Sequence, residues 1–408
     1  DSLQGIQGIS DPHVLRDSGA ILFKTFNYDG SNDIVLYHNN IISSLVHDDD
    51  LNDPFYSPSG HILYTGDTAG SENIFALPFS LLRLSGTGPP FPIIEDSSRP
   101  SISIDGTLVY YYRRTPRQEQ LVWVDREGRI ADPIGRQQDR ISTPALAPNG
   151  NRIAAGGEES VGRDVWIHDT RGSATRVTFD RGREYQPVWF PSGDRIAYTR
   201  QGDILSRAAD GSGTVDSLVT GPMPEWAPDI SSDGRYLTYH QAPSRNNRDL
   251  WYMPLTGDRQ PVSLLETPQD QAMPQFSPDG RYVAYMSNIS GEWEIYVISF
   301  PDGGDRQQIS INGGIQPRWN GRVDELFYLE GQNVMAVPID TRNGFTTGVP
   351  RPLFSADEAG VFLRRNNNWN VEYDVAPDGQ RFVMKRIIDS EERQNSIVIV
   401  QNWIKEFE

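Results

Sequence analysis

A proline that is followed six residues later by a glycine recurs along the chain, and this repeat constrains the fold more than any other feature. Successive prolines of the clear copies are 41 to 46 residues apart, and looser copies at 16–19, 317–321 and 376–379 bring the number of units to nine. A fixed period of this length predicts a repeat architecture in which each unit is one supersecondary structure. The clear copies are Pro54/Gly60, Pro100/Gly106, Pro144/Gly150, Pro187/Gly193, Pro228/Gly234 and Pro274/Gly280.

Each unit contains several short strands in the same order. A β-branched and aromatic run follows the glycine, as at 62–64 (ILY) and 283–285 (VAY), and after a polar loop comes an alternating segment such as 164–168 (DVWIH). The Asp-Gly, Asn-Gly and Ser-Gly pairs are typical of tight turns, since glycine adopts positive φ at no steric cost. A proline at the first residue of a strand forfeits no ladder hydrogen bond. We therefore predict that each unit is a four-stranded antiparallel sheet.

Sheets of this size cannot bury their apolar faces alone, so neighbouring sheets must stack. Radial stacking predicts an all-β fold, a single β-propeller domain over residues 1–408, because helical periodicity is missing throughout. Nine blades are favoured, with eight as the alternative. Residues 1–9 resemble a final strand and are predicted to complete the last blade, which removes the exposed edge of the ring. The predicted blades are 10–53, 54–98, 99–142, 143–186, 187–226, 227–272, 273–315, 316–360 and 370–408 together with 1–9.

Composition excludes several classes of function. The formal net charge is −18, which disfavours nucleic acid and anionic membrane surfaces, whose binding depends on Lys and Arg. The basic spots are short: Arg113, Arg114 and Arg117; Arg181 and Arg183; Arg364 and Arg365. Cysteine is absent, which rules out disulfides, thiol nucleophiles and Cys-ligated metals. No apolar run approaches 18 residues, so we expect no membrane insertion of this chain. A start at Asp1 predicts a processed product or an excised domain.

Several longer stretches carry a family resemblance. SPDGR at 277–281, with YVAY at 282–285 and EIYVI at 294–298, resembles the PD40 (WD40-like) repeat of TolB-like propellers. Three further stretches are similar to the propellers that follow the transmembrane helix of some bacterial receptor-type Ser/Thr protein kinases. That resemblance implies an extracytoplasmic domain (periplasmic, cell-surface or secreted) that binds or senses without chemistry of its own. The stretches are QLVWVDREGR (120–129), GIQPRWNGRVDELFYLEGQNVMAVPI (314–339) and YDVAPDGQRFVM (373–384).

No catalytic constellation stands out, so we predict that the chain is not an enzyme. A G-x-S-x-G pentad is missing, and the six histidines form no i, i+4 pair. An acidic residue opens the third strand of many units, and a residue that recurs in every blade is expected to hold a loop in every blade. Apart from Ca²⁺, we expect no cofactor. Hard oxygen ligands that suit Ca²⁺ cluster at NYDGSND (27–33) and HDDDLND (47–53), and an ordinary turn is the alternative interpretation of each segment. The recurring acids are Asp33, Asp164, Asp203, Asp249 and Glu294.

The residues just before the opening prolines are the candidate contacts for a ligand or partner. They enter the innermost strands, are polar, and should surround one mouth of the central channel. Such a ring suits a wet funnel that binds a ligand or peptide, and it also suits a solvated rim without a ligand. The candidates are Asp11, Asp53, Arg99, Thr143, Gln186 and Gln316.

Three hypotheses about function follow. The leading one is a non-enzymatic extracytoplasmic propeller that recognises a protein or peptide partner. The second is a self-associating cell-surface or filament component, in which strand-like ends at 1–7 and 396–408 pass to a neighbouring copy by β-augmentation. The third is an enzyme, a hydrolase or lyase, with its site in the funnel; it requires carboxylates or histidines to converge at one channel mouth.

Overall fold

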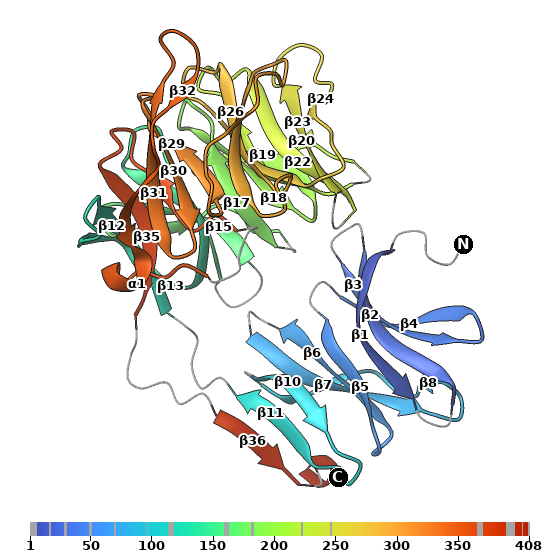
Figure 1. Ribbon diagram of the computed structural model, residues 1–408. Coiled ribbons are helices and arrows are strands. Elements are labelled where there is room, and N and C mark those ends of the chain that lie inside the picture. The colour runs from blue at the N-terminus through green and yellow to red at the C-terminus, as the bar shows by residue number, and fades with distance from the viewer. Residues whose placement is uncertain are drawn as a thin grey trace. The chain divides into compact units, whose positions relative to one another are not determined.

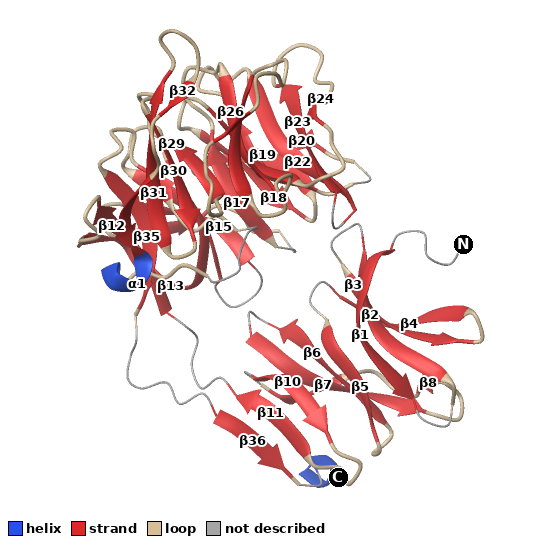
Figure 2. Ribbon diagram, viewed as in Figure 1, coloured by secondary structure: helices blue, strands red, loops and turns tan. Residues whose placement is uncertain are grey.

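The chain forms two compact units that consist almost entirely of strands (Figures 1 and 2). The ring unit comprises residues 117–159 and 163–388, and the stack unit comprises 1–116, 160–162 and 389–408. In the part that is described, no helix is long and apolar enough to cross a membrane. The computed structural model describes residues 6–15, 18–27, 31–48, 51–68, 71–95, 97–112, 118–158, 163–180, 183–221, 223–244, 247–364, 370–388, 396–401 and 403–406.

The ring unit contains six blades, which we number from the one that closes the ring. Blade 1 holds β34 (Asp374–Val375), β35 (Arg381–Ile387), β12 (Gln118–Asp125) and the first half of β13 (Ile130–Leu146). Blade 2 holds the second half of β13, β14 (Arg152–Glu158), β15 (Arg163–Asp169) and β16 (Ala174–Arg176). Blade 3 holds β17 (Glu184–Trp189), β18 (Arg195–Arg200), β19 (Asp203–Ala208) and β20 (Asp216–Val219).

The other three blades repeat this antiparallel order. Blade 4 holds β21 (Glu225–Ile230), β22 (Tyr236–Ser244), β23 (Asn247–Pro254) and β24 (Val262–Leu265). Blade 5 holds β25 (Gln271–Phe276), β26 (Tyr282–Ser287), β27 (Glu294–Ser299) and β28 (Gln307–Gln308). Blade 6 holds β29 (Ile315–Trp319), β30 (Glu325–Glu330) and β31 (Asn333–Asp340), with β32 (Thr346–Thr347) and β33 (Arg351–Ser355) both on β31, before α1 (Ala356–Ala359).

The ring closes through strands that are far apart in the sequence. β12 pairs with β35 over a continuous register from Glu119↔Ile387 to Asp125↔Arg381. The first strands of successive blades contact one another around the ring, including β29 with β34 and β34 with β13. The ring unit is therefore a closed propeller of four-stranded antiparallel blades.

The stack unit contains three blade-like sheets. The first has the order β1 (Ile6–Leu15), β2 (Ala20–Asn27), β3 (Asn32–His38) and β4 (Ile41–Asp48). The second has β5 (Asn52–Ser57), β6 (His61–Thr68), β7 (Ser71–Ser80) and β8 (Ser85–Gly86), with β9 (Phe91–Ile94) also on β7. The third has β10 (Ser97–Ile102), β11 (Leu108–Tyr112) and β36 (Ser396–Val400), and the 3₁₀-helix η1 (Trp403–Glu406) follows β36.

The all-β propeller of four-stranded blades is confirmed, whereas its predicted closure is wrong. The described strands form eight sheets, and the seven-stranded one carries both blade 1 and blade 2. Six blades make the ring unit and three sheets make the stack unit, so the described residues do not form one nine-bladed ring. Residues 1–5 of the predicted closing strand lie outside the described residues. Residues 6–9 belong to β1, which pairs with β2. The predicted units 99–142 and 370–408 instead exchange halves, because β35 pairs with β12 and β36 pairs with β11.

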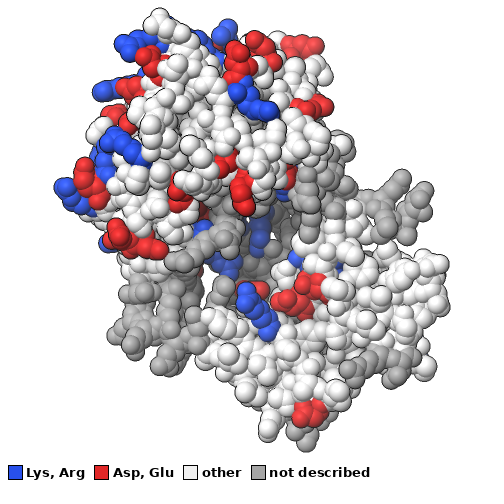
Figure 3. Space-filling model, in the orientation of Figure 1, with Lys and Arg blue, Asp and Glu red and all other residues white. Residues whose placement is uncertain are grey.

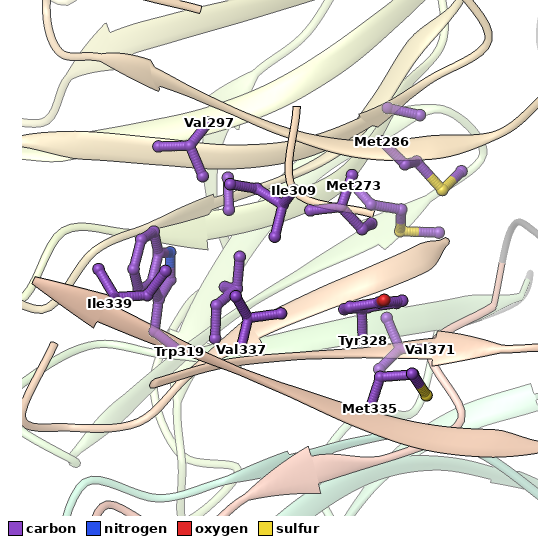
Figure 4. Packing of buried hydrophobic residues seen from close by; sticks show 14 residues of the cluster. Met273, Met286, Val297, Ile309, Trp319, Tyr328, Met335, Val337, Ile339 and Val371 are labelled. Carbon is purple, nitrogen blue, oxygen red and sulfur yellow. The ribbon is translucent and has the colours of Figure 1, made fainter. Parts of the chain in front are cut away.

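The core of the ring unit lies between successive blades. Figure 4 shows this packing where blade 5 meets blade 6. Met273, Met286 and Val297 of blade 5 lie against Tyr328 and Val337 of blade 6, and all five are buried. On the face drawn in Figure 3, acidic and basic side chains are interspersed over the ring unit without a block of one sign. Alternation along each strand thus places one set of apolar side chains in each inter-blade layer.

Phe382→Ala tests the closure of the ring. Phe382 is fully buried, and its ring centroid lies 5.2 Å from Phe327 and 5.6 Å from Phe354 of blade 6. Truncation should lower the free energy of unfolding by about 3–5 kcal/mol, measured by urea unfolding, because a large cavity opens at the closing blade. Leu82→Ala, at a site that is 95% exposed, is the control and should change little. A Phe382 variant as stable as the wild type would contradict this closure.

Deletion of residues 1–9 separates the two possible closures. The deletion removes part of β1, which pairs with β2 in the stack unit. Hydrogen exchange measured during thermal unfolding should show unchanged amide protection in the ring unit and reduced amide protection in β2. Loss of protection in β35 would instead support closure by the N-terminal strand.

Candidate functional site in the central channel

Residues from all six blades line a cavity inside the ring unit, and each blade contributes one residue at an equivalent position. Five of them directly follow the opening prolines of blades 2 to 6, and the sixth occupies the same position in β34 of blade 1. The cavity has a volume of about 200 Å³. Two of the six are apolar, two are acidic, one is an amide and one is a guanidinium. We call these six the channel ring: Ala145, Val188, Asp229, Gln275, Arg318 and Asp374.

The two channel-ring carboxylates bind the backbone of the next blade. Asp229 Oδ2 accepts a hydrogen bond of 2.7 Å from the amide of Phe276, and Asp374 Oδ2 accepts one of 2.6 Å from the amide of Leu146. The innermost strand of a blade is an edge strand, so its amides need partners from outside the sheet. Each carboxylate therefore joins two neighbouring blades at the channel wall.

Tryptophan side chains make the complementary contact at two other blade junctions. Trp189 Nε1 donates to the carbonyl of Ala145 at 2.9 Å, and Trp319 Nε1 donates to the carbonyl of Gln275 at 3.2 Å. Both carbonyls belong to channel-ring residues. Much of the hydrogen-bonding capacity along the channel wall is thus used for assembly, and the carboxylates are not simply free acids.

Arg318 sets the charge inside the channel. Its Nε lies 3.4 Å from Asp374 Oδ1, and its Nη1 donates to the carbonyl of Pro317 at 2.8 Å. Burial raises the pKa of Asp229 to about 7, and the amide of Phe276 and the charge of Arg318 limit that rise. Burial likewise raises the pKa of Asp374, while Arg318 opposes the shift. Arg318 and Asp374 therefore form an ion-pair contact in the channel, and the carboxyl of Asp229 titrates near neutral pH.

The six predicted mouth residues share one backbone feature. All six have positive φ, from 50° to 58°. Each of them also lies at a shift in the pairing register between the first and second strands of its sheet. The dipeptide that ends in proline therefore marks a β-bulge, an extra residue in the first strand. Met273 has the same conformation, with φ 54°, and was not among the candidates.

The structure divides these candidates between the two units. Thr143 and Gln186 line the channel cavity, and Thr143 Oγ1 accepts a 3.2 Å hydrogen bond from the amide of Gln186. Gln316 is fully buried, and its amide side chain accepts from the amide of Glu372 at 2.8 Å. The other three lie in the stack unit, where burial and then the charge of Asp11 raise the pKa of Asp53, and Arg99 lowers it.

Sequence reasoning missed the channel ring itself. Asp229 and Arg318 directly follow their prolines, so the residue after each opening proline, two positions beyond the predicted one, would have found them. Asp374 has no such signal, because the residue before it in blade 1 is Tyr373. The channel-ring residue thus lies two positions after the predicted one, directly after the dipeptide that forms the β-bulge.

The recurring acids at the third strands hold adjacent segments in place, as predicted. Asp164 Oδ1 accepts from Arg176 Nη2 at 3.0 Å, Asp249 Oδ1 accepts from the amide of Thr267 at 3.4 Å, and Glu294 Oε1 accepts from the amide of Gly313 at 3.1 Å. Asp33 accepts from Asn27 Nδ2 at 2.6 Å. Each acid joins its third strand to a neighbouring loop or strand.

The calcium candidates fall partly outside the described residues, which omit 28–30 and 49–50. The basic spots at 113–117, Arg181 and Arg365 also lie outside. Within the residues described, no three His, Asp or Glu side chains are placed to hold a metal ion.

Two buried carboxyls lie where the first strands of blades 3 and 4 begin. Burial raises the pKa of Glu184 to about 8, with Asp164 adding to the rise, and burial raises the pKa of Glu225 to about 7. Glu225 Oε1 accepts from Gln241 Nε2 at 3.1 Å, while its Oε2 has no hydrogen-bond partner. At neutral pH a substantial fraction of both groups is therefore protonated.

Glu225→Gln should stabilise the ring unit at alkaline pH. Burial raises the pKa of Glu225 above the ordinary value of 4.5, so ionisation of Glu225 costs folding free energy as pH rises through about 5 to 8. The variant should be more stable than the wild type at pH 8, by on the order of 2 kcal/mol, and should lose this advantage at pH 4.5. Urea unfolding at both pH values measures the difference. Glu292→Gln, on an exposed loop, is the control, and equal gains at both pH values would contradict the assignment.

Comparisons with known proteins agree with this architecture. No curated protein is similar in sequence, and no known family pattern matches. A putative TolB from Agrobacterium tumefaciens aligns with 67% of this chain and 100% of its own, at 17% identity and a TM-score of 0.54. TolB from Acinetobacter baumannii aligns with 73% and 77%, at 14% identity and 0.37, and an oligogalacturonate lyase in complex with manganese aligns with 75% and 82%, at 14% identity and 0.44. The first alignment confirms the fold: this chain has a TolB-like β-propeller.

Proposed function

We propose that the chain is a non-enzymatic, extracytoplasmic module whose ring unit binds a peptide segment of a protein partner in the central channel. The channel ring carries the proposal, because it presents apolar, acidic, amide and basic groups around one cavity. A volume of about 200 Å³ accommodates one or two side chains and lies below the range typical of pockets for drug-sized ligands. Localisation outside the cytoplasm is supported by the resemblance of 120–129, 314–339 and 373–384 to receptor-kinase propellers.

The channel carboxylates already accept hydrogen bonds from backbone amides, which also favours a binding function over catalysis. Asp229 and Asp374 already accept hydrogen bonds that join blades, so their geometry serves assembly. Gln275 and Arg318 offer donors toward a peptide, and Ala145 and Val188 offer apolar contact. Such a mixture suits a peptide side chain that has an apolar part and a polar terminal group.

An enzyme with its site in the channel is the second candidate, and Asp229 is the observation that favours it. A carboxyl with a pKa of about 7 suits a general acid or base at neutral pH. Two carboxyls and one guanidinium also occur in one cavity. The binding proposal requires a bound peptide to be recovered intact, whereas the enzyme requires cleavage that Asp229→Asn abolishes.

Self-association through donation of the C-terminal strand has less support than peptide binding. β36, which was considered as a donated strand, pairs with β11 of the same chain from Leu108↔Val400 to Tyr112↔Ser396. Its outward-facing Ile397 and Ile399 are 72% and 65% exposed. One edge of β36 is therefore already paired within this chain, and its outer edge is the one that a strand of another chain could pair with.

Ala145→Trp tests channel binding. Peptides selected from a random display library on the immobilised full chain should bind the wild type and lose at least tenfold in affinity for the variant, because the indole fills the cavity. Val349→Trp, at an exposed site of the ring unit, is the matched control, and thermal unfolding verifies that both variants fold. Equal affinity for wild type and Ala145→Trp, or failure to select any peptide, would contradict the proposal.

A further inference from the structure

Arg318 lines the channel cavity and uses few of the hydrogen-bond donors on its guanidinium. The residue is 9% exposed and lies on β29 of blade 6. Its Nη1 donates to the carbonyl of Pro317 at 2.8 Å, its Nε lies 3.4 Å from Asp374 Oδ1, and it donates no other hydrogen bond to a described residue. A guanidinium carries five N–H donors, and no nitrogen of Arg318 is both buried and without a partner, so the unused donors are accessible from the cavity.

The two carboxyls of the channel ring have backbone partners of their own. Asp374 Oδ2 accepts from the amide of Leu146 at 2.6 Å, and Asp374 Oδ1 accepts from the amide of Val375 at 2.9 Å. Asp229 Oδ2 accepts from a backbone amide of blade 5 at 2.7 Å. Asp374 offsets part of the charge of Arg318, and the amides hold both carboxyls at the channel wall. The donors that remain unused on Arg318 therefore suit an acceptor group of a ligand.

Asp229 adds a second kind of donor when it is protonated. Burial raises the pKa of Asp229 to about 7, against the opposing effect of the Phe276 amide. The charge of Arg318 also lowers this pKa, and the charge of Asp374 raises it. A carboxylate bound beside Asp229 would raise the pKa of Asp229 further and favour its protonated form, whose O–H can donate to that carboxylate. Near neutral pH, a carboxylate ligand is therefore expected to bind together with a proton.

Apolar side chains form another part of the cavity wall. Ala145, Val188 and Val371 line the same space as Arg318. The volume of about 200 Å³ holds a carboxylate together with a short aliphatic stem. An acidic side chain has this form, and so does the C-terminal residue of a peptide. A lysine or arginine side chain would instead bring a second cation to Arg318, which is unfavourable.

We propose that Arg318 binds a carboxylate of the peptide that occupies the channel, either an acidic side chain or the C-terminal carboxylate. This inference rests on the proposed function, because it names the group of the peptide that the cavity takes. An arginine fork binds a carboxylate through two parallel N–H···O bonds, which fixes the orientation of the bound group as well as its charge. Asp229 in its protonated form donates a further hydrogen bond to the same carboxylate.

Peptides from the random display library that bind the full chain and lose affinity for Ala145→Trp are the probe. Each is synthesised with its acidic residues exchanged for the corresponding amides, and separately with an amidated C-terminus, and its affinity is measured by calorimetry at pH 7. Removal of the carboxylate that the channel takes should weaken binding at least tenfold, because charge-assisted hydrogen bonds are lost. A loss on side-chain exchange assigns the carboxylate to an acidic residue, and a loss on amidation assigns it to the C-terminus.

Arg318→Gln tests the partner of that carboxylate on the protein. The variant should weaken binding of the carboxylate peptide at least tenfold and change the affinity of the carboxylate-free peptide less than twofold, a coupling that a general disturbance of the channel would not produce. Arg318→Lys keeps the charge without the fork and should bind with intermediate affinity. Arg195→Gln, at a side chain that is 35% exposed and pairs with Asp216, is the control and should leave both affinities unchanged.

The pH dependence of binding tests the contribution of Asp229. Wild-type affinity for the carboxylate peptide should fall about tenfold from pH 6 to pH 8, because the protonated fraction of a group with a pKa of about 7 falls by that factor. Asp229→Asn keeps an N–H donor at every pH, so this variant should bind the peptide equally at both values. A wild-type affinity that stays level or rises with pH would overturn the inference, since a cationic ligand group gives a rise.

The failure of this inference is distinguishable from that of the proposed function. Channel-binding peptides that keep their affinity without any carboxylate, or that bind Arg318→Gln as well as the wild type, would overturn the inference and leave the proposed function standing. If the selection yields no channel-binding peptide, both fall.

Discussion

Pairing between β12 and β35 is the interaction on which the ring unit depends. The seven matched residue pairs, from Glu119↔Ile387 to Asp125↔Arg381, join strands from opposite ends of the ring's sequence into one blade. Without them, blade 1 would separate into two halves, and β35 and β12 would each present an unpaired strand edge. The buried Phe382 and Lys385 lie on β35, so apolar packing and ion pairing reinforce the same closure.

Closure also creates the channel and determines its chemistry. Six first strands meet with their inner edges facing one cavity, and side chains must satisfy the amides and carbonyls there. Asp229, Asp374, Trp189 and Trp319 do so across blade junctions. Part of the polar chemistry of the channel wall is therefore committed to holding neighbouring blades together.

The candidate site shows which features of the channel local sequence patterns can predict. The residue before each opening proline is a real structural position, a bulge with positive φ, and Thr143 and Gln186 do line the cavity. Two residues that set the charge of the channel were not predicted: Arg318 lies two residues after Gln316, and Asp374 lies in a strand without an opening proline.

The sequence by itself determined the sheets: tight turns, alternation and strand-opening prolines are local, and they specify nine blade-like sheets of the propeller type. Only the tertiary structure decided how these sheets divide into a ring of six and a stack of three. The physical reason is that strand edges offer the same amides and carbonyls everywhere, so local pattern does not specify that β12 takes β35 and β11 takes β36. For β12 and β35, that choice buries facing side chains such as Val122 and Met384, whereas Ile397 and Ile399 of β36 remain exposed.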